Sequence, residues 1–133
     1  MASILVVDDD RDVAESLEML LEAERHSVRI AHDGREGLAL VCDTPPDLIV
    51  LDVEMPLLDG PGMALQLLIH GRGLEKIPIV LVSGSSGLPA VAAGIGTPYA
   101  LSKPFDIDDF LALVAQALEE RRAPSHGPKA QLG

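Results

Sequence analysis

The sequence contains no tryptophan, little phenylalanine or tyrosine, and far fewer basic than acidic residues. Lysine and arginine number 10 against 21 aspartates and glutamates, which gives a formal net charge of -11. Nucleic acids and anionic membranes are bound through basic surface patches. The charge therefore argues against either one as a direct partner and favours a metal ion or a basic protein surface.

Cysteine is also scarce, since Cys42 is the only one. An intrachain disulfide is thus excluded, which fits a reducing compartment, and we expect Cys42 to be a small buried hydrophobic side chain. The opening residues, MASILVV, contain neither a basic segment nor an apolar run long enough for a signal peptide or a membrane span. We expect a soluble cytoplasmic protein.

The 133 residues are enough for one domain, and 47% of them are hydrophobic. Short apolar runs, most of them rich in valine and isoleucine, predict buried strands at residues 3–7, 27–31, 47–51, 77–82 and 98–101. Apolar residues recur at helical spacing between these runs. Strands that alternate with helices predict a doubly wound α/β fold, a five-stranded parallel sheet with helices on both faces.

Two segments depart from this regular pattern. Residues 84–97, GSSGLPAVAAGIGT, contain four glycines and Pro89, so any helix there should be short and mobile. After Arg122 the segment APSHGPKAQLG has no periodicity. We expect one domain over residues 1–122, a flexible C-terminal tail over residues 123–133, and no output domain.

Polar residues follow four of the five predicted strands. Asp8 and Asp9 follow the first run, Asp52 the third, Ser83 the fourth and Lys103 the fifth. In an open parallel sheet, ligands bind at the carboxyl ends of the strands, near the point where the strand order reverses. The sequence therefore predicts a site at this edge of the sheet.

The charges of these residues indicate the chemistry of the site. The carboxylates and the single lysine leave a net charge of about -2, which a divalent cation neutralises, and oxygen ligands favour Mg2+. An oxygen of Asp52 is placed to attack a phosphoryl group, with the metal and Lys103 screening its negative charge. Ser83 is placed to donate a hydrogen bond to a phosphoryl oxygen. These residues fit a carboxylate that becomes phosphorylated.

Other acidic residues near these segments are assigned structural roles. Asp10 and Asp12 favour the start of the first helix, where carboxylates complement the helix dipole. Asp59, in the segment LLDGPG, is typical of a turn or a cap, and Asp106 precedes the last helix as a candidate N-cap.

Four segments, VVDDD, LDVEMPLLDG, VLVSG and LSKPF, occur in this order along the chain. Together they resemble the receiver domain of bacterial two-component response regulators, over residues 3–122. The resemblance implies the flavodoxin-like strand order 2-1-3-4-5 and a stand-alone, chemotaxis-receiver-like signalling domain. Such a domain is not an enzyme, although it assists its own phosphorylation and dephosphorylation. A histidine kinase or a histidine phosphotransfer protein would donate the phosphoryl group, and a downstream protein would be the target.

The same resemblance assigns a role to each residue of the predicted site. It implies that Asp52 is the phosphoacceptor and that Asp9 and Asp52 bind Mg2+ directly. Asp8 would act through metal-bound water, and Glu54 would contribute its backbone carbonyl to the metal. Ser83 and Lys103 would contact the phosphoryl group, and the peptide bond that follows this lysine would be cis.

The sequence departs from the family pattern on the last strand. Receivers usually have tyrosine or phenylalanine three residues before the lysine, where this chain has Ala100. Tyr99 is one residue earlier, and strand alternation turns it to the opposite face of the sheet. We expect Tyr99 to point away from the fourth and fifth helices, so that the glycine-rich segment of residues 84–97 carries the signal instead.

Two other functions stay open. A pseudo-receiver would have the same fold and act as a binding module that is never phosphorylated. The segment VVDDDRD also fits the Asp8-x-Asp10 pattern of magnesium-dependent phosphatases of the haloacid dehalogenase type, with Ser83 and Lys103 as later motifs. Against a phosphatase, the chain is short for a core and a cap, no strand after Lys103 ends in an acidic pair, and the segment DVEMP that begins at Asp52 goes unexplained.

Overall fold

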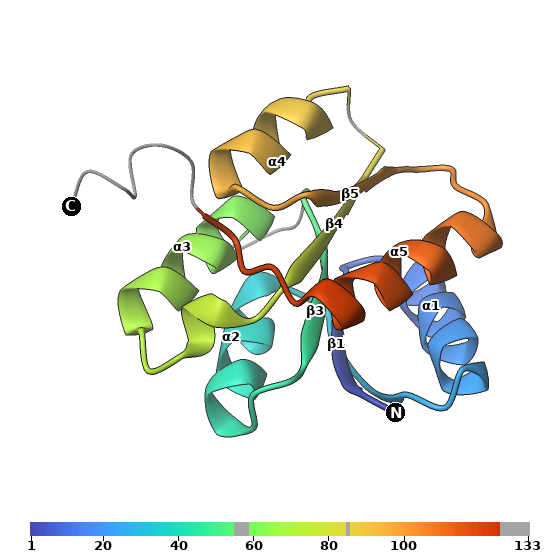
Figure 1. Ribbon diagram of the computed structural model, residues 1–133, viewed down its shortest axis with the longest axis horizontal. Helices are drawn as coiled ribbons and strands as arrows, with labels where there is room; N and C mark the ends of the chain where they lie inside the picture. The colour runs from blue at the N-terminus through green and yellow to red at the C-terminus, as the bar shows by residue number, and fades with distance from the viewer. Residues whose placement is uncertain (55–58, 85, 126–133) are drawn as a thin grey trace.

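The computed structural model of the protein describes residues 1–54, 59–84 and 86–125. Strands and helices alternate along these residues, as the apolar runs predict (Figure 1). The strands are β1 (Ser3–Val7), β2 (Ser27–Ala31), β3 (Leu48–Asp52), β4 (Ile79–Ser83) and β5 (Tyr99–Ser102). The helices are α1 (Arg11–Ala23), α2 (Gly34–Asp43), α3 (Gly60–His70), the short 3-10 helix η1 (Leu74–Lys76), α4 (Leu88–Ile95) and α5 (Ile107–Glu120). None of these helices is long and apolar enough to cross a membrane.

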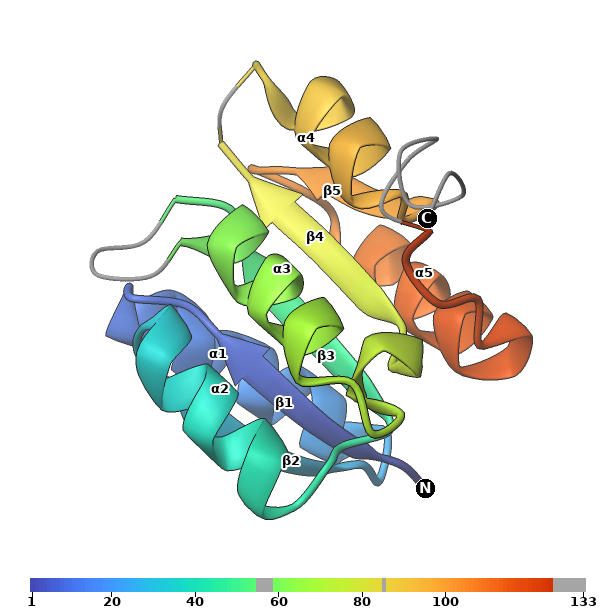
Figure 2. The same ribbon diagram turned by 90° about the vertical axis from the view of Figure 1, so that its left-hand side faces the viewer.

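All five strands are parallel and form one sheet in the order β2-β1-β3-β4-β5. The helices α1 and α5 cover one face of the sheet, and α2, α3 and α4 cover the other (Figure 1 and Figure 2). Right-handed connections produce this arrangement when the chain moves outward from β1 in both directions. The predicted doubly wound α/β fold and its flavodoxin-like strand order are confirmed.

The central strands are buried on both faces, and their side chains alternate between two hydrophobic cores. In β1, Leu5 and Val7 belong to the core beneath α2, α3 and α4, whereas Ile4 and Val6 belong to the core beneath α1 and α5. A strand that is buried on both faces needs apolar residues at every position. This double burial explains why the strands appear in the sequence as continuous apolar runs.

Asp10 and Asp59, for which the sequence predicts structural roles, are the N-cap residues of α1 and α3. The Asp10 carboxylate accepts a hydrogen bond from the amide of Asp12 (3.0 Å) at the start of α1, and the Asp59 carboxylate accepts one from the amide of Gly62 (2.8 Å) at the start of α3. These bonds satisfy amides that have no partner within the helix. Asp106 is also an N-cap residue, but its side chain makes no capping hydrogen bond.

The helix α4 spans only eight residues, which confirms that it is short. Pro89 lies in its first turn, where a missing amide removes no intrahelical hydrogen bond. Gly96 ends the helix with a φ of 82°, a left-handed conformation that glycine adopts without strain. The mobility of this segment stays a prediction.

Adjacent residues of β5 face opposite cores. Ala100 packs against the core beneath α4, and Tyr99 is fully buried in the core beneath α5. The predicted alternation is therefore confirmed. We predicted that Tyr99 points away from α4 and α5. This prediction is wrong for α5, because α5 covers the face of β5 opposite α4, and Tyr99 lies on that face. The Tyr99 hydroxyl donates a hydrogen bond to Glu120 Oε1 at 2.9 Å.

Cys42 is exposed on α2, so the prediction that it is buried is wrong. The buried stripe of this helix runs through Gly34, Gly37 and Val41. Because an α-helix turns by about 100° per residue, Cys42 is rotated away from the position of its neighbour Val41.

The chain beyond α5 packs against the end of α4 for as far as it is described. Pro124 is buried, and the amide of Ser125 donates a hydrogen bond to the carbonyl of Gly96 at 3.1 Å. Residues 126–133 lie outside the described residues. The flexibility expected of residues 123–133 therefore stays a prediction.

Candidate functional site

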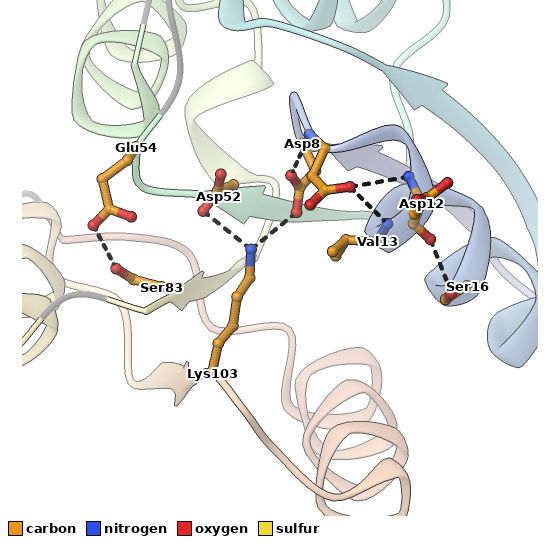
Figure 3. A network of polar contacts seen from close by, with 9 residues as sticks. Asp8, Asp12, Val13, Ser16, Asp52, Glu54, Ser83 and Lys103 are labelled. Atoms are coloured by element: carbon orange, nitrogen blue, oxygen red, sulfur yellow. Dashed lines mark hydrogen bonds and ion pairs between the residues drawn. The ribbon is translucent and has the colours of Figure 1, made fainter.

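Polar residues from four strands meet at the carboxyl edge of the sheet (Figure 3). Asp8 follows β1, Asp52 and Ser83 are the last residues of β3 and β4, and Lys103 follows β5. The structure thus brings together the residues that the strand ends predict. Residues 55–58, within the segment LDVEMPLLDG, lie outside the described residues.

The acidic residues form a compact cluster. One carboxylate oxygen from each of Asp8, Asp9 and Asp52 lies within 4.8 Å of the other two. Asp8 and Asp52 are 1% and 4% exposed, whereas Asp9 is exposed. The amide of Asp10 donates a hydrogen bond to Asp8 Oδ1 at 2.9 Å, which orients the Asp8 side chain at the turn between β1 and α1. Carboxylates this close repel one another unless positive charge lies between them.

Asp10 has a different role from its neighbours. Its Oδ1 atom accepts hydrogen bonds from the amides of Asp12 and Val13 in the first turn of α1. The two aspartates of the phosphatase pattern are therefore divided between a pocket residue, Asp8, and a helix cap, Asp10. This division counts against the phosphatase alternative.

Lys103 is the cation of the pocket. Its Nζ atom lies 3.2 Å from Asp8 Oδ2 and 3.5 Å from Asp52 Oδ1. Burial of the ammonium lowers its pKa, but the charges of Asp8 and Asp52 outweigh this effect, so the pKa of Lys103 lies above its ordinary value. Lys103 is therefore charged at neutral pH. The Lys103–Pro104 peptide bond is cis, as the family resemblance implies.

The Asp52 carboxyl group is strongly perturbed by its surroundings. Burial raises the pKa of Asp52 to about 6, and the negative charge of Asp8 adds to this effect. Lys103 opposes the increase, while Glu54 and Asp9 contribute to it. Asp52 Oδ1 is buried and accepts no hydrogen bond from any group in the described part of the chain. A buried oxygen of this kind is available to a cation or to a reacting group.

Ser83 makes a contact that the sequence did not predict. Its hydroxyl donates a hydrogen bond to Glu54 Oε1 at 2.6 Å (Figure 3). The family resemblance implies a role only for the backbone carbonyl of Glu54. Strand alternation gives no signal for this contact, because β3 ends at Asp52 and residues 53 and 54 form a bend.

The donor set of the pocket fits a divalent cation. The candidate ligands are carboxylate oxygens from Asp8, Asp9 and Asp52, the type of ligand that hard cations prefer. Together with Lys103 they leave a net charge of about -2 when all are ionised. The buried Asp52 oxygen without a hydrogen bond is the group that a cation would satisfy.

Sequence comparison identifies related proteins. The family described as the response regulator receiver domain matches residues 4–115. The chain is 41% identical over 127 residues to response regulator MprA of Mycobacterium sp. (strain KMS), covering 94% of this chain and 54% of that protein. It is 42% identical over 123 residues to response regulator MprA of Mycobacterium tuberculosis, covering 91% of this chain and 52% of that protein. The chain thus spans about half the length of these relatives.

Two solved receiver structures are similar to this chain over nearly their whole length. The receiver domain of the Francisella response regulator 1452 superposes with a TM-score of 0.79 at 26% identity, covering 92% of this chain and 100% of that chain. A CheY-like response regulator receiver domain protein from Methanospirillum hungatei superposes with a TM-score of 0.81 at 26% identity, covering 91% and 96%.

Proposed function

Because this chain belongs to the response regulator receiver domain family, whose members are phosphoacceptor domains of two-component signalling, we propose that Asp52 accepts the phosphoryl group. One observation carries this proposal. Asp52 Oδ1 is buried, accepts no hydrogen bond from the described residues and lies 3.5 Å from the Lys103 ammonium. A phosphoacceptor carboxylate needs an available oxygen and a cation that offsets the incoming negative charge.

The residues of the pocket divide the transfer between them. An oxygen of Asp52 attacks the phosphorus of a phosphohistidine, the phosphorus–nitrogen bond breaks, and its electron pair stays on the imidazole of the donor. Lys103 lies beside the attacking carboxylate and offsets the charge of the phosphoryl group. Ser83, at the end of the neighbouring strand β4, donates a hydrogen bond to a phosphoryl oxygen.

The metal that fits this pocket is Mg2+. We assign it to the carboxylates of Asp9 and Asp52 and to the backbone carbonyl of Glu54, with Asp8 acting through metal-bound water. When bound, Mg2+ supplies positive charge that balances the carboxylates and the phosphoryl oxygens. The oxygen-only ligand set and the net charge of the pocket support this assignment.

The phosphoryl donor is assigned to a histidine kinase or a histidine phosphotransfer protein, and an apolar groove beside the pocket fits its docking. The groove is lined by Val13, Leu17 and Leu20 of α1 and by Phe105 and Ile107 near the start of α5. The groove begins close to the pocket residues in the chain. Phe105 comes two residues after Lys103, and Val13 comes four residues after Asp9. Exposed aspartates at positions 106, 108 and 109 border it and fit a basic rim on the donor.

We assign this function to a domain over residues 1–122, followed by a tail over residues 123–133, acting in the cytoplasm on a downstream protein. The direct experiment incubates the protein with Mg2+ and acetyl phosphate, a small phosphoryl donor, and measures its intact mass. A phosphoacceptor gains the mass of one phosphoryl group at Asp52. A pseudo-receiver gains none.

A further inference from the structure

The hydrogen bond between Ser83 and Glu54 is not used in the transfer described above. Ser83 Oγ lies 2.6 Å from Glu54 Oε1 (Figure 3). Ser83 is fully buried, whereas Glu54 is exposed. The two residues come from neighbouring strand ends, because Asp52 pairs with Val82 in the register of β3 and β4. A hydroxyl that donates to a charged carboxylate at this distance makes one of the stronger hydrogen bonds of proteins.

Ser83 can give its hydrogen to only one acceptor at a time, because a serine hydroxyl carries a single donor. In the unphosphorylated protein it donates to Glu54. A phosphoryl group on Asp52 requires the same hydrogen if Ser83 is to contact a phosphoryl oxygen. The Glu54 carboxylate and the phosphoryl group therefore compete for one donor.

The negative charge that phosphorylation adds to Asp52 also favours the loss of the Ser83–Glu54 hydrogen bond. Phosphorylation replaces the single negative charge of a carboxylate with a group that carries a charge of about -2. Glu54 follows Asp52 by two residues, so its carboxylate is repelled more strongly after phosphorylation than before. The same added charge attracts the Ser83 hydroxyl toward Asp52.

We propose that Glu54 is a positioning residue that holds the Ser83 hydroxyl in the unphosphorylated protein and loses it to the phosphoryl group when Asp52 is phosphorylated. The inference rests on the proposed function. The Ser83–Glu54 hydrogen bond opposes the phosphorylated state, because it has to break before Ser83 contacts the phosphoryl group. Ser83 is the last residue of β4 and precedes α4 in the chain, so its change of partner acts directly on the segment that leads into α4.

The test compares Glu54→Ala and Glu54→Gln with wild type in their affinity for beryllium fluoride, a phosphoryl mimic, in the presence of Mg2+. Glu54→Ala removes the competing acceptor and should bind the mimic about tenfold more tightly, the effect of losing one charged hydrogen bond. Glu54→Gln keeps an uncharged acceptor and should fall between Glu54→Ala and wild type. Glu119→Gln removes an equal charge from an exposed position at the far end of α5 and should match wild type.

The same comparison in a Ser83→Ala background separates the hydrogen bond from the charge of Glu54. Without the Ser83 hydroxyl there is nothing for Glu54 to hold, so Glu54→Ala should change the affinity much less than it does in wild type. Equal changes in the two backgrounds would overturn the inference, because Glu54 would then act by its charge alone.

A second measurement uses the protein without metal or beryllium fluoride. Glu54→Ala should shift the backbone amide resonances of Ser83 and Gly84 in NMR spectra, whereas Glu119→Gln should leave them in place. Unchanged resonances in Glu54→Ala would overturn the inference. A wild type that binds no beryllium fluoride would overturn the proposed function together with it, a result distinct from tight binding that is insensitive to Glu54.

Discussion

The hydroxyl of Tyr99 donates a hydrogen bond to the Glu120 carboxylate at 2.9 Å, at the C-terminal end of α5. The amide of Arg122 donates to the same hydroxyl at 3.3 Å, and the ring is fully buried. Tyr99 begins β5, whereas Asp52 ends β3, so the only tyrosine of the chain lies at the opposite edge of the sheet from the pocket. On the face of β5 beneath α4 stands Ala100, which has no ring to reorient.

This arrangement predicts that phosphorylation acts on α4 and not on the aromatic residue of β5. Hydrogen exchange in residues 84–97 should slow when beryllium fluoride binds, because this segment follows Ser83 directly and its four glycines and Pro89 predict low local stability. Tyr99→Phe should leave that response unchanged. Protection that appears only around Tyr99 and α5 would contradict the prediction.

The raised pKa of Asp52 predicts a specific dependence of stability on pH. The pKa of Asp52 rises from 3.8 to about 6 on folding, so the folded state binds a proton more tightly than the unfolded state. The contribution of Asp52 to stability is therefore largest at low pH and is lost as the pH rises from about 4 through 6. In metal-free buffer, Asp52→Asn should gain thermal stability relative to wild type over this interval. Asp108→Asn, at an exposed position on α5, is the control for the loss of one negative charge. A stability difference between Asp52→Asn and wild type that does not vary with pH would refute the prediction.

Magnesium should stabilise the folded protein, because it binds the assembled carboxylates and not the unfolded chain. At a concentration a hundredfold above its Kd, the free energy of unfolding should rise by about 2.7 kcal/mol. Asp9→Ala should abolish this increase, and Asp108→Asn should retain it. Thermal denaturation with and without Mg2+ measures the effect. A wild type whose melting temperature is insensitive to Mg2+ would support the pseudo-receiver.

If the apolar groove docks the protein donor, a change in the groove should slow phosphorylation by a histidine kinase but not by a small-molecule donor. Ile107 is 53% exposed at the groove, and Ile107→Asp places a charge there. Transfer from a histidine kinase that phosphorylates wild type should slow by about tenfold or more, a typical cost of losing a central contact. Phosphorylation by acetyl phosphate should continue at the wild-type rate. Ile69→Asp changes an equally apolar residue on α3, 66% exposed, and should affect neither reaction. Equal slowing by both variants would argue against the groove.

The fold and the members of the pocket could be predicted from the sequence for one physical reason. Asp8, Asp52 and Lys103 each come at the end of a continuous apolar run, and parallel strands end at the same edge of a sheet. The prediction needs only the strand order and the position of each strand end. The strand bounds are accurate to within two residues, which is sufficient for this purpose.

Contacts that depend on the direction of a side chain could not be predicted in the same way. The spacing placed Tyr99 on the face opposite Ala100, but not against Glu120, which is 21 residues further along the chain. The hydrogen bond between Glu54 and Ser83 joins two strand ends that are 29 residues apart and depends on the conformation of an exposed side chain. Composition alone favoured burial of Cys42, and the rotation of α2 decided otherwise.

The central claim is that Asp52 accepts the phosphoryl group, and intact mass spectrometry of wild type and Asp52→Asn tests it most directly. After incubation with acetyl phosphate and Mg2+, wild type should gain the mass of one phosphoryl group. Asp52→Asn has nearly the same size but no carboxylate to attack phosphorus, so it should gain none, while Asp59→Asn, changed at a helix cap outside the pocket, should gain the wild-type mass. Labelling of Asp52→Asn to the extent of wild type, or no labelling of wild type, would contradict the claim.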